Sequence, residues 1–215
     1  MQPGCSSAQP AYGVLQPHLS KGGQPLVSKQ EQHQQRRLQI LQTALDLFVT
    51  KGYYGTSTRE ISKAAGISSG LMFHYFPSKQ QVYEELITIG CQRMDVDFAA
   101  ALEDPDRFLE AMVDELLNLV ARHPFAAKMF VLMENAFFMR DISETVNALL
   151  DARNVAELSR EVIVQGQLLG QFKEGDPLAL SLAFWNALQG IAQHLALRPQ
   201  HPMPEASWLM DMLRK

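Results

Sequence analysis

The stretch STREISKAAGISSGLMFHYFPSK, residues 57–79, decides the fold of this chain. It begins with Ser-x-x-Glu, the capping-box pattern in which Ser57 caps a helix and the glutamate three residues later reaches back to it. Gly66 then stops the helical pattern, and Ser68 is placed to cap a second short helix that ends before Pro77. Two short helices joined by a tight, glycine-containing turn are the layout of a helix-turn-helix.

The second of these helices has an unusual composition for either a surface helix or a core helix. Ser68, Ser69 and Gly70 are small and come first, aromatic side chains come last, and few charges are present. In a helix-turn-helix the second helix enters the major groove with its N-terminal residues leading, so short side chains let the backbone approach DNA. Gly70 costs about 1 kcal/mol of helix propensity relative to Ala. A close approach to DNA explains that cost, and a packing role for Gly70 is the alternative.

We expect the helix-turn-helix to contact both phosphates and base edges. Hydroxyls and amides at the start of the second helix can bind a phosphate, which the helix dipole favours. Leu71 suits a thymine methyl group, and His74 suits a base edge or a phosphate. Each residue alone has an ordinary structural role as its alternative, so the prediction depends on their joint spacing. The predicted DNA-binding residues are Ser57, Thr58, Arg59, Ser68, Ser69, Gly70, Leu71, Phe73, His74, Tyr75 and Lys79.

Residues 56–87 resemble the DNA-binding domain of the tetracycline-repressor (TetR) family of bacterial transcription regulators, and the resemblance covers about residues 37–87. The matching residues keep the order and spacing of the family pattern: Thr56-Ser57, Arg59-Glu60-Ile61, Ala65-Gly66-Ile67-Ser68, Gly70, Tyr75-Phe76 and Lys79. One departure is Phe73, where the family often has a tyrosine whose hydroxyl bonds a phosphate. The resemblance implies a cytoplasmic homodimer that binds a palindromic operator in double-stranded DNA.

The chain divides into three parts by composition. Residues 1–33 are rich in Gln, Pro, Gly and Ser, which predicts a disordered tail. Residues 34–87 form the helix-turn-helix domain, whose first helix is an amphipathic one from Leu38. Residues 88–215 continue with helical periodicity and no strand signals, so the fold class is all-α. The predicted helices of this last part, and the one that leads into it, cover 78–101, 104–122, 124–139, 143–169, 176–195 and 204–214.

By resemblance, residues 88–215 form a ligand-binding and dimerisation domain. Large, soft side chains in this segment predict an adaptable apolar pocket for an unknown small-molecule effector, with core packing as the alternative. The candidate pocket residues are Met112, Phe130, Met133, Glu134, Phe137 and Trp185. The segments 176–195 and 204–214 are apolar enough to form a four-helix bundle across a two-fold axis. The candidate interface residues are Leu180, Phe184, Leu188, Ile191 and Trp208.

Charge and composition set limits on the function. Residues 34–90 hold six basic and four acidic residues, whereas residues 91–215 hold 11 basic and 18 acidic ones, which is consistent with a polyanion partner at one end. Two cysteines give no disulfide framework, and no apolar run is long enough for a membrane span. The sequence contains no catalytic motif, cofactor motif or metal-ligand spacing. The favoured prediction is a ligand-released repressor; an activator, or a DNA-binding dimer controlled by a protein partner, is the alternative.

Overall fold

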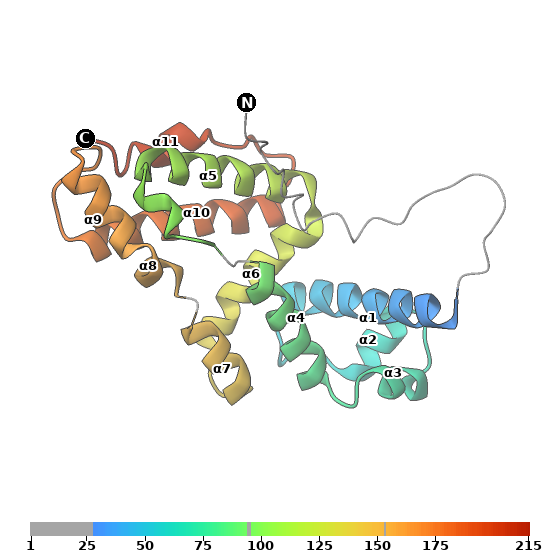
Figure 1. The fold of residues 1–215 in the computed structure, drawn as a ribbon. Coiled ribbons are helices and arrows are strands. Elements are labelled where there is room, and N and C mark those ends of the chain that lie inside the picture. Colours follow the sequence, from blue (N-terminus) through green and yellow to red (C-terminus); the bar gives the residue numbers. More distant parts are fainter. Residues whose placement is uncertain (1–27, 94–95, 153) are drawn as a thin grey trace, which may run out of the picture.

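The computed structural model describes residues 28–93, 96–152 and 154–215, which form two groups of helices (Figure 1). The first group, which we call the head, contains α1 Lys29–Lys51, α2 Thr58–Ala64, α3 Ser69–Tyr75 and α4 Lys79–Arg93. The rest, which we call the body, contains η1 Ala100–Leu102, α5 Pro105–Arg122, α6 Pro124–Phe138, α7 Glu144–Asp151, α8 Val155–Leu158, α9 Arg160–Leu168, α10 Pro177–Leu197 and α11 Ala206–Met210.

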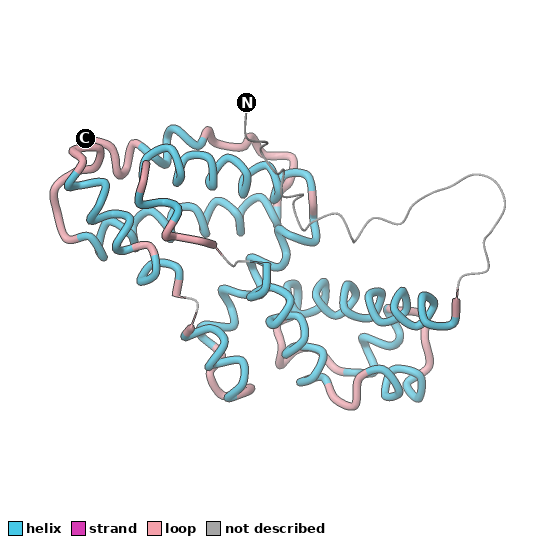
Figure 2. The backbone as a smooth tube through the Cα atoms, viewed as in Figure 1, coloured by secondary structure: helices cyan, strands magenta, loops and turns pink. Residues whose placement is uncertain are grey.

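The predicted all-α fold class is confirmed (Figure 2). Within the described ranges, the only extended pairing outside the helices is one isolated antiparallel bridge between Phe172 and Arg214. The Asp-Pro pairs act as helix starts, as predicted: Asp104 accepts a hydrogen bond from the Arg107 amide, and Asp176 accepts one from the Ala179 amide. In the described part of the chain no single helix has the length and hydropathy to cross a membrane; α5 and α6, bent by 111° at their junction, pass that test only together.

Helix α1 begins earlier than predicted. Ser28 caps it by accepting a hydrogen bond from the Glu31 amide, and the Glu31 carboxylate accepts one from the Ser28 amide. This capping box extends the helix through residues 29–33, so the predicted disordered tail is wrong there. Residues 1–27 of that predicted tail lie outside the described residues. The Ser-x-x-Glu signal was present in the sequence, but the glutamine-rich composition obscured it.

Three other predicted helices differ from the structure. Helix α4 ends at Arg93, not 101, and the chain turns where the Asp97 carboxylate accepts a hydrogen bond from the Ala99 amide. The predicted helix 143–169 is divided into α7, α8 and α9, because the Asn154 side chain caps a new helical turn. The last helix covers only Ala206–Met210, since the residues after it pair with the segment at Phe172.

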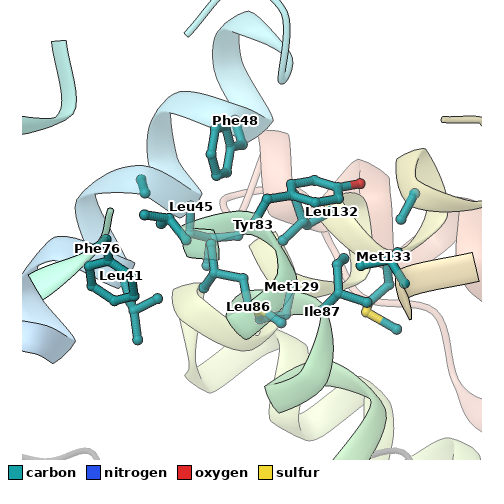
Figure 3. Close-up of a cluster of buried hydrophobic side chains, with 14 of the residues drawn as sticks. Leu41, Leu45, Phe48, Phe76, Tyr83, Leu86, Ile87, Met129, Leu132 and Met133 are labelled. Carbon is teal, nitrogen blue, oxygen red and sulfur yellow. The ribbon is translucent and has the colours of Figure 1, made fainter. Parts of the chain in front are cut away.

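The head and part of the body share one hydrophobic core. Leu45 and Phe48 of α1 and Tyr83 of α4 lie in one buried cluster with Leu132 and Met133 of α6 (Figure 3). Helix α4 also runs through the predicted domain boundary at 87/88. Burial of apolar surface across this boundary joins the head to α6 and α7 in one packed core.

A second core holds the distal body together. It contains buried residues from α5, α9, α10 and α11, including Leu109, Phe184 and Leu188, together with Phe172 from the segment between α9 and α10. Arg214 closes this core: it donates to both Asp106 oxygens, at 2.7 and 2.9 Å, and to Glu110 at 2.9 Å. Helix α6 packs into the core shared with the head and meets α10 in a small separate cluster that contains Ala127 and Ala192.

Candidate nucleic-acid interface

The start of α2 is held by the predicted capping box. The Ser57 hydroxyl accepts a hydrogen bond from the Glu60 amide at 3.2 Å, and the Glu60 carboxylate accepts one from the Ser57 amide at 3.0 Å. Lys51 at the end of α1 donates to the same carboxylate at 2.7 Å. Hydrogen bonds from Lys51 and then Ser57 lower the pKa of Glu60 to about 2. This pairing ties α1 to the start of α2.

The turn between α2 and α3 has the geometry of a helix-turn-helix. Gly66 has φ +66°, a left-handed conformation that glycine adopts without steric cost. The Ile67 amide donates to the Ser62 carbonyl at 3.0 Å, which closes the turn. Buried Ile61 and Ala65 from α2 and Met72 from α3 hold the two helices together. Ser68 then caps α3 by accepting a hydrogen bond from the Leu71 amide at 3.1 Å.

Helix α3 is anchored by one face and presents the other to solvent. Met72, and Phe76 directly after the helix, are buried in the shared core. The opposite face is exposed, although two of its members are large and apolar: Leu71 is 38% exposed and Phe73 is 50% exposed. The exposed residues of α3 are Ser69, Gly70, Leu71, Phe73 and His74. This face is free to enter a groove while its anchor residues fix its position.

Gly70 makes no close packing contact among the residues that the structure describes. Apart from the backbone of its own helix, a Cβ atom built on it meets no heavy atom within 4 Å, and its φ lies outside the left-handed region. The described residues therefore give no support to the alternative of a packing glycine. The open space at Gly70 would let another molecule approach the α3 backbone closely.

The other predicted contact residues surround this face, with one revision. Ser57, Arg59 and Ser68 are exposed, and Thr58 and Tyr75 are half-buried. Lys79 is also among the predicted DNA contacts. Its Nζ instead donates to the Tyr53 and Thr56 carbonyls at 2.7 and 2.8 Å, which leaves the amide at the start of α4 as the expected contact.

Arg37 was not predicted, yet it positions the end of α3. Its guanidinium donates to both oxygens of Glu85, and its Nη1 donates to the Tyr75 carbonyl at 3.1 Å. It also lies 4.3 Å above the Phe76 ring. The periodicity of α1 places Arg37 only at the polar edge of the helix. Its partners lie 38 and 48 residues away in the sequence, so no local pattern predicted these contacts.

Comparison with known proteins identifies the group to which this architecture belongs. A sequence profile described as "Bacterial regulatory proteins, tetR family" matches residues 40–86, the segment that contains α2 and α3. Residues 40–86 of this chain match the tetR family. The predicted resemblance is thereby confirmed for the helix-turn-helix segment.

Individual relatives extend the match beyond the head. The chain is 35% identical over 97 residues to the HTH-type transcriptional regulator EthR of Mycolicibacterium smegmatis, which covers 43% of this chain and 45% of EthR. It is 28% identical over 161 residues to the HTH-type transcriptional regulator RutR of Escherichia coli K12, covering 71% and 72%. The alignment with EthR thus spans under half of that relative.

A solved tetR-like structure matches nearly the whole described chain. The crystal structure of AibR in complex with isovaleryl coenzyme A and operator DNA has a TM-score of 0.62 at 21% identity. The match covers 82% of this chain and 94% of AibR. At this identity the likeness concerns the fold alone: an N-terminal helix-turn-helix domain followed by a helical body.

The residues of the predicted effector pocket are not gathered in one place. Met112 and Trp185 pack with the distal core, Phe130 packs with a small cluster around Ala192, and Met133 and Phe137 belong to the core shared with the head. The predicted single pocket therefore becomes a set of positions distributed along α5, α6 and α10. Glu134 is half-buried on α6, and desolvation raises the pKa of its carboxyl group.

Two predicted interface residues need correction. Phe184 and Leu188 are only 1% and 2% exposed, because they pack into the core of their own chain. They leave no surface for a partner subunit. Leu180 and Ile191 are half-buried, and Trp208 is 61% exposed on α11. The apolar periodicity of α10 was predicted correctly, but it marks the side of the helix that faces the core of its own chain.

The exposed face of α10 carries no charged residue. No Asp, Glu, Lys or Arg occurs between Pro177 and Leu197. The exposed positions follow helical spacing and are mostly small or apolar: Ala179, Leu182, Ala183, Asn186, Gly190, His194 and Leu197. Neighbouring α9 adds Leu168, which is 77% exposed. A soluble helix normally carries charge on such a face, so this surface is unusual for one left in water.

Proposed function

We propose that this protein is a DNA-binding transcriptional regulator that reads the major groove with α3. The observation that carries the proposal is the exposed face of α3, where Gly70 has open space around it while Met72 and Phe76 anchor the helix. Leu71 and Phe73 can cover apolar base edges and sugar, and Ser69 and His74 can hydrogen-bond phosphates or bases. Ser57, Thr58, Arg59, Ser68, Tyr75 and the Lys79 amide are proposed to contact the backbone.

The active form in this proposal is a homodimer. The uncharged exposed face of α10, together with Leu168 of α9, is large and apolar enough to pair with its two-fold copy as a four-helix bundle. Two heads related by a two-fold axis would read a palindrome, whose half-site spacing reflects the separation of the heads. Leu182 and Ala183 replace Phe184 and Leu188 as proposed interface residues.

We further propose that a small molecule bound to the body releases the DNA. Helix α6 belongs to the core shared with the head and also packs against α10, where Gln189 donates to the Phe130 carbonyl of α6 at 3.1 Å. A ligand that favours a different position of α6 would shift α1 and α4 through the shared core. Its effect is limited by the difference in its affinity for the two states. The similarly folded AibR was solved in complex with isovaleryl coenzyme A and operator DNA, which supports a fold that binds both DNA and a small molecule.

Selection of random duplex DNA by the purified, ligand-free protein, followed by sequencing, tests the proposal. Recovery of a palindrome establishes a dimeric operator reader and supplies the probe for an effector screen. A folded dimer that enriches no sequence would contradict the proposal. A protein partner for the body is the second candidate, and an effector screen that never releases the operator would favour it.

A further inference from the structure

A cluster of three rings closes the C-terminal end of α3, and one ring comes from the first turns of α1. The His33 and Tyr75 ring centroids are 4.6 Å apart, and the planes are tilted by 33°. His33 and His74 lie 6.4 Å apart at 86°, and His74 and Tyr75 lie 5.6 Å apart at 83°. Both histidines are exposed, whereas Tyr75 is half-buried.

The first part of α1 lies largely outside the hydrophobic core. Residues 29–37 precede the segment matched by the family profile, which begins at residue 40. Their side chains are almost all polar and exposed, and the first residue of α1 in the hydrophobic core is Ile40. The capping box at Ser28 nevertheless starts the helix there, which carries His33 to the exposed end of α3.

Helix α3 needs support at this end. It has only seven residues, and its last turn is followed by an extended residue, Phe76. Arg37 holds the backbone through the Tyr75 carbonyl, but it does not hold the Tyr75 ring. His33 lies one helical turn before Arg37 on the same side of α1, so the two residues form a brace: one holds the backbone and the other the ring.

We propose that His33 is a positioning residue for DNA recognition. Stacked on Tyr75, it restrains the last turn of α3 and thereby the direction in which His74 and Phe73 are presented to the groove. This inference rests on the proposed function, because it assigns a role within the same DNA-reading surface. His33 need not touch DNA for this role, since ring stacking acts on the free protein as well.

The test compares His33→Ala with His33→Phe, which keeps a ring, and His33→Lys, which replaces the ring by a cation. The probe is the duplex recovered by selection with the wild-type protein. We expect His33→Ala to weaken binding about three- to tenfold, the range of one aromatic pair, and His33→Phe to restore it. Gln34→Ala, at the adjacent exposed position, should bind like the wild type.

Salt dependence separates positioning from direct phosphate contact. With positioning, the slope of log K against log salt is unchanged in His33→Ala; loss of a phosphate contact would reduce it by about one. A reduced slope together with restoration by His33→Lys and not by His33→Phe would overturn the proposal.

A measurement without DNA distinguishes failure of this inference from failure of the proposed function. In the free protein, His33→Ala should speed hydrogen exchange at the Phe76 amide, which donates to the Met72 carbonyl at 2.9 Å, while His33→Phe should not. Unchanged exchange in His33→Ala overturns the positioning role even where wild-type DNA binding is established. Failure of the wild type to select any duplex contradicts the proposed function instead.

Discussion

The ammonium group of Lys79 lies 4.1 Å from the centre of the Tyr53 ring and donates to the Tyr53 carbonyl at 2.7 Å. A second bond, to the Thr56 carbonyl at 2.8 Å, completes its contacts with the turn between α1 and α2. Lysine at this point of the family pattern thus has a structural role in this chain: it joins the start of α4 to the turn that precedes the reading helices. Burial of the ammonium lowers the pKa of Lys79.

Replacing this lysine should destabilise the head. Lys79→Met removes the donor to two carbonyls but keeps the aliphatic chain, and hydrogen bonds from a charged group suggest a loss of about 1–2 kcal/mol for a half-exposed site. Urea unfolding followed by circular dichroism measures it. Lys63→Met, at an exposed position of α2, is the matched control. Equal unfolding midpoints for the two variants would show that the contacts at Lys79 contribute nothing to stability.

Glu60 should give a measurable acid dependence of stability. Its pKa is lowered in the folded state from 4.5 to about 2 by Lys51 and Ser57. Because the folded value is the lower one, its contribution is fully present above pH about 4.5 and is lost as pH falls through about 2. The difference in urea midpoint between wild type and Glu60→Gln should therefore shrink from pH 6 to pH 2. Glu115→Gln, an exposed change on α5, controls for loss of one charge; a pH-independent difference for Glu60→Gln would contradict the assignment.

Substitutions at Gly70 should affect stability and DNA binding differently. Gly70→Ala places a methyl group in open space, so the helix should gain up to about 1 kcal/mol in unfolding free energy. Gly70→Leu should leave the fold intact and abolish operator binding, because the side chain keeps the α3 backbone away from the groove. Thermal unfolding and gel-shift titration of both variants measure the two effects. Full operator affinity in Gly70→Leu would show that α3 is not the reader.

The proposed dimer face on α10 can be distinguished from the core face of the same helix. Ala183→Glu adds a charge to the exposed, uncharged stripe and should give folded monomers in sedimentation equilibrium, with unchanged helix content. Leu188→Ala instead opens the distal core and should lower the unfolding free energy by about 2–5 kcal/mol. Asn118→Glu, at an exposed position of α5, is the control for an added charge. A dimer that survives Ala183→Glu with unchanged dissociation constant would place the interface elsewhere.

Local signals in the sequence determined much of the fold. Ser57 with Glu60, Gly66, Ser68, Asp104 with Pro105 and Asp176 with Pro177 each act on a backbone within four residues, and each starts or ends the predicted element. The same reasoning located the exposed face of α3, because small residues and aromatics at fixed spacing need no distant partner to be recognised. The capping box at Ser28 shows that one such signal was overlooked.

Only the tertiary structure decided which partner each side chain meets. An apolar helix must bury one face, but the apolar composition of α10 did not distinguish Leu188, which packs into its own core, from Leu182 on the surface. The ammonium of Lys79 finds carbonyls 23 and 26 residues away, and His33 meets Tyr75 across 42 positions of chain. Caps and turns are determined by neighbours in sequence, whereas packing depends on chain segments that only folding brings together. For this protein the sequence alone therefore located α3, the proposed DNA-reading helix, and the three-dimensional contacts decided what holds that helix in place.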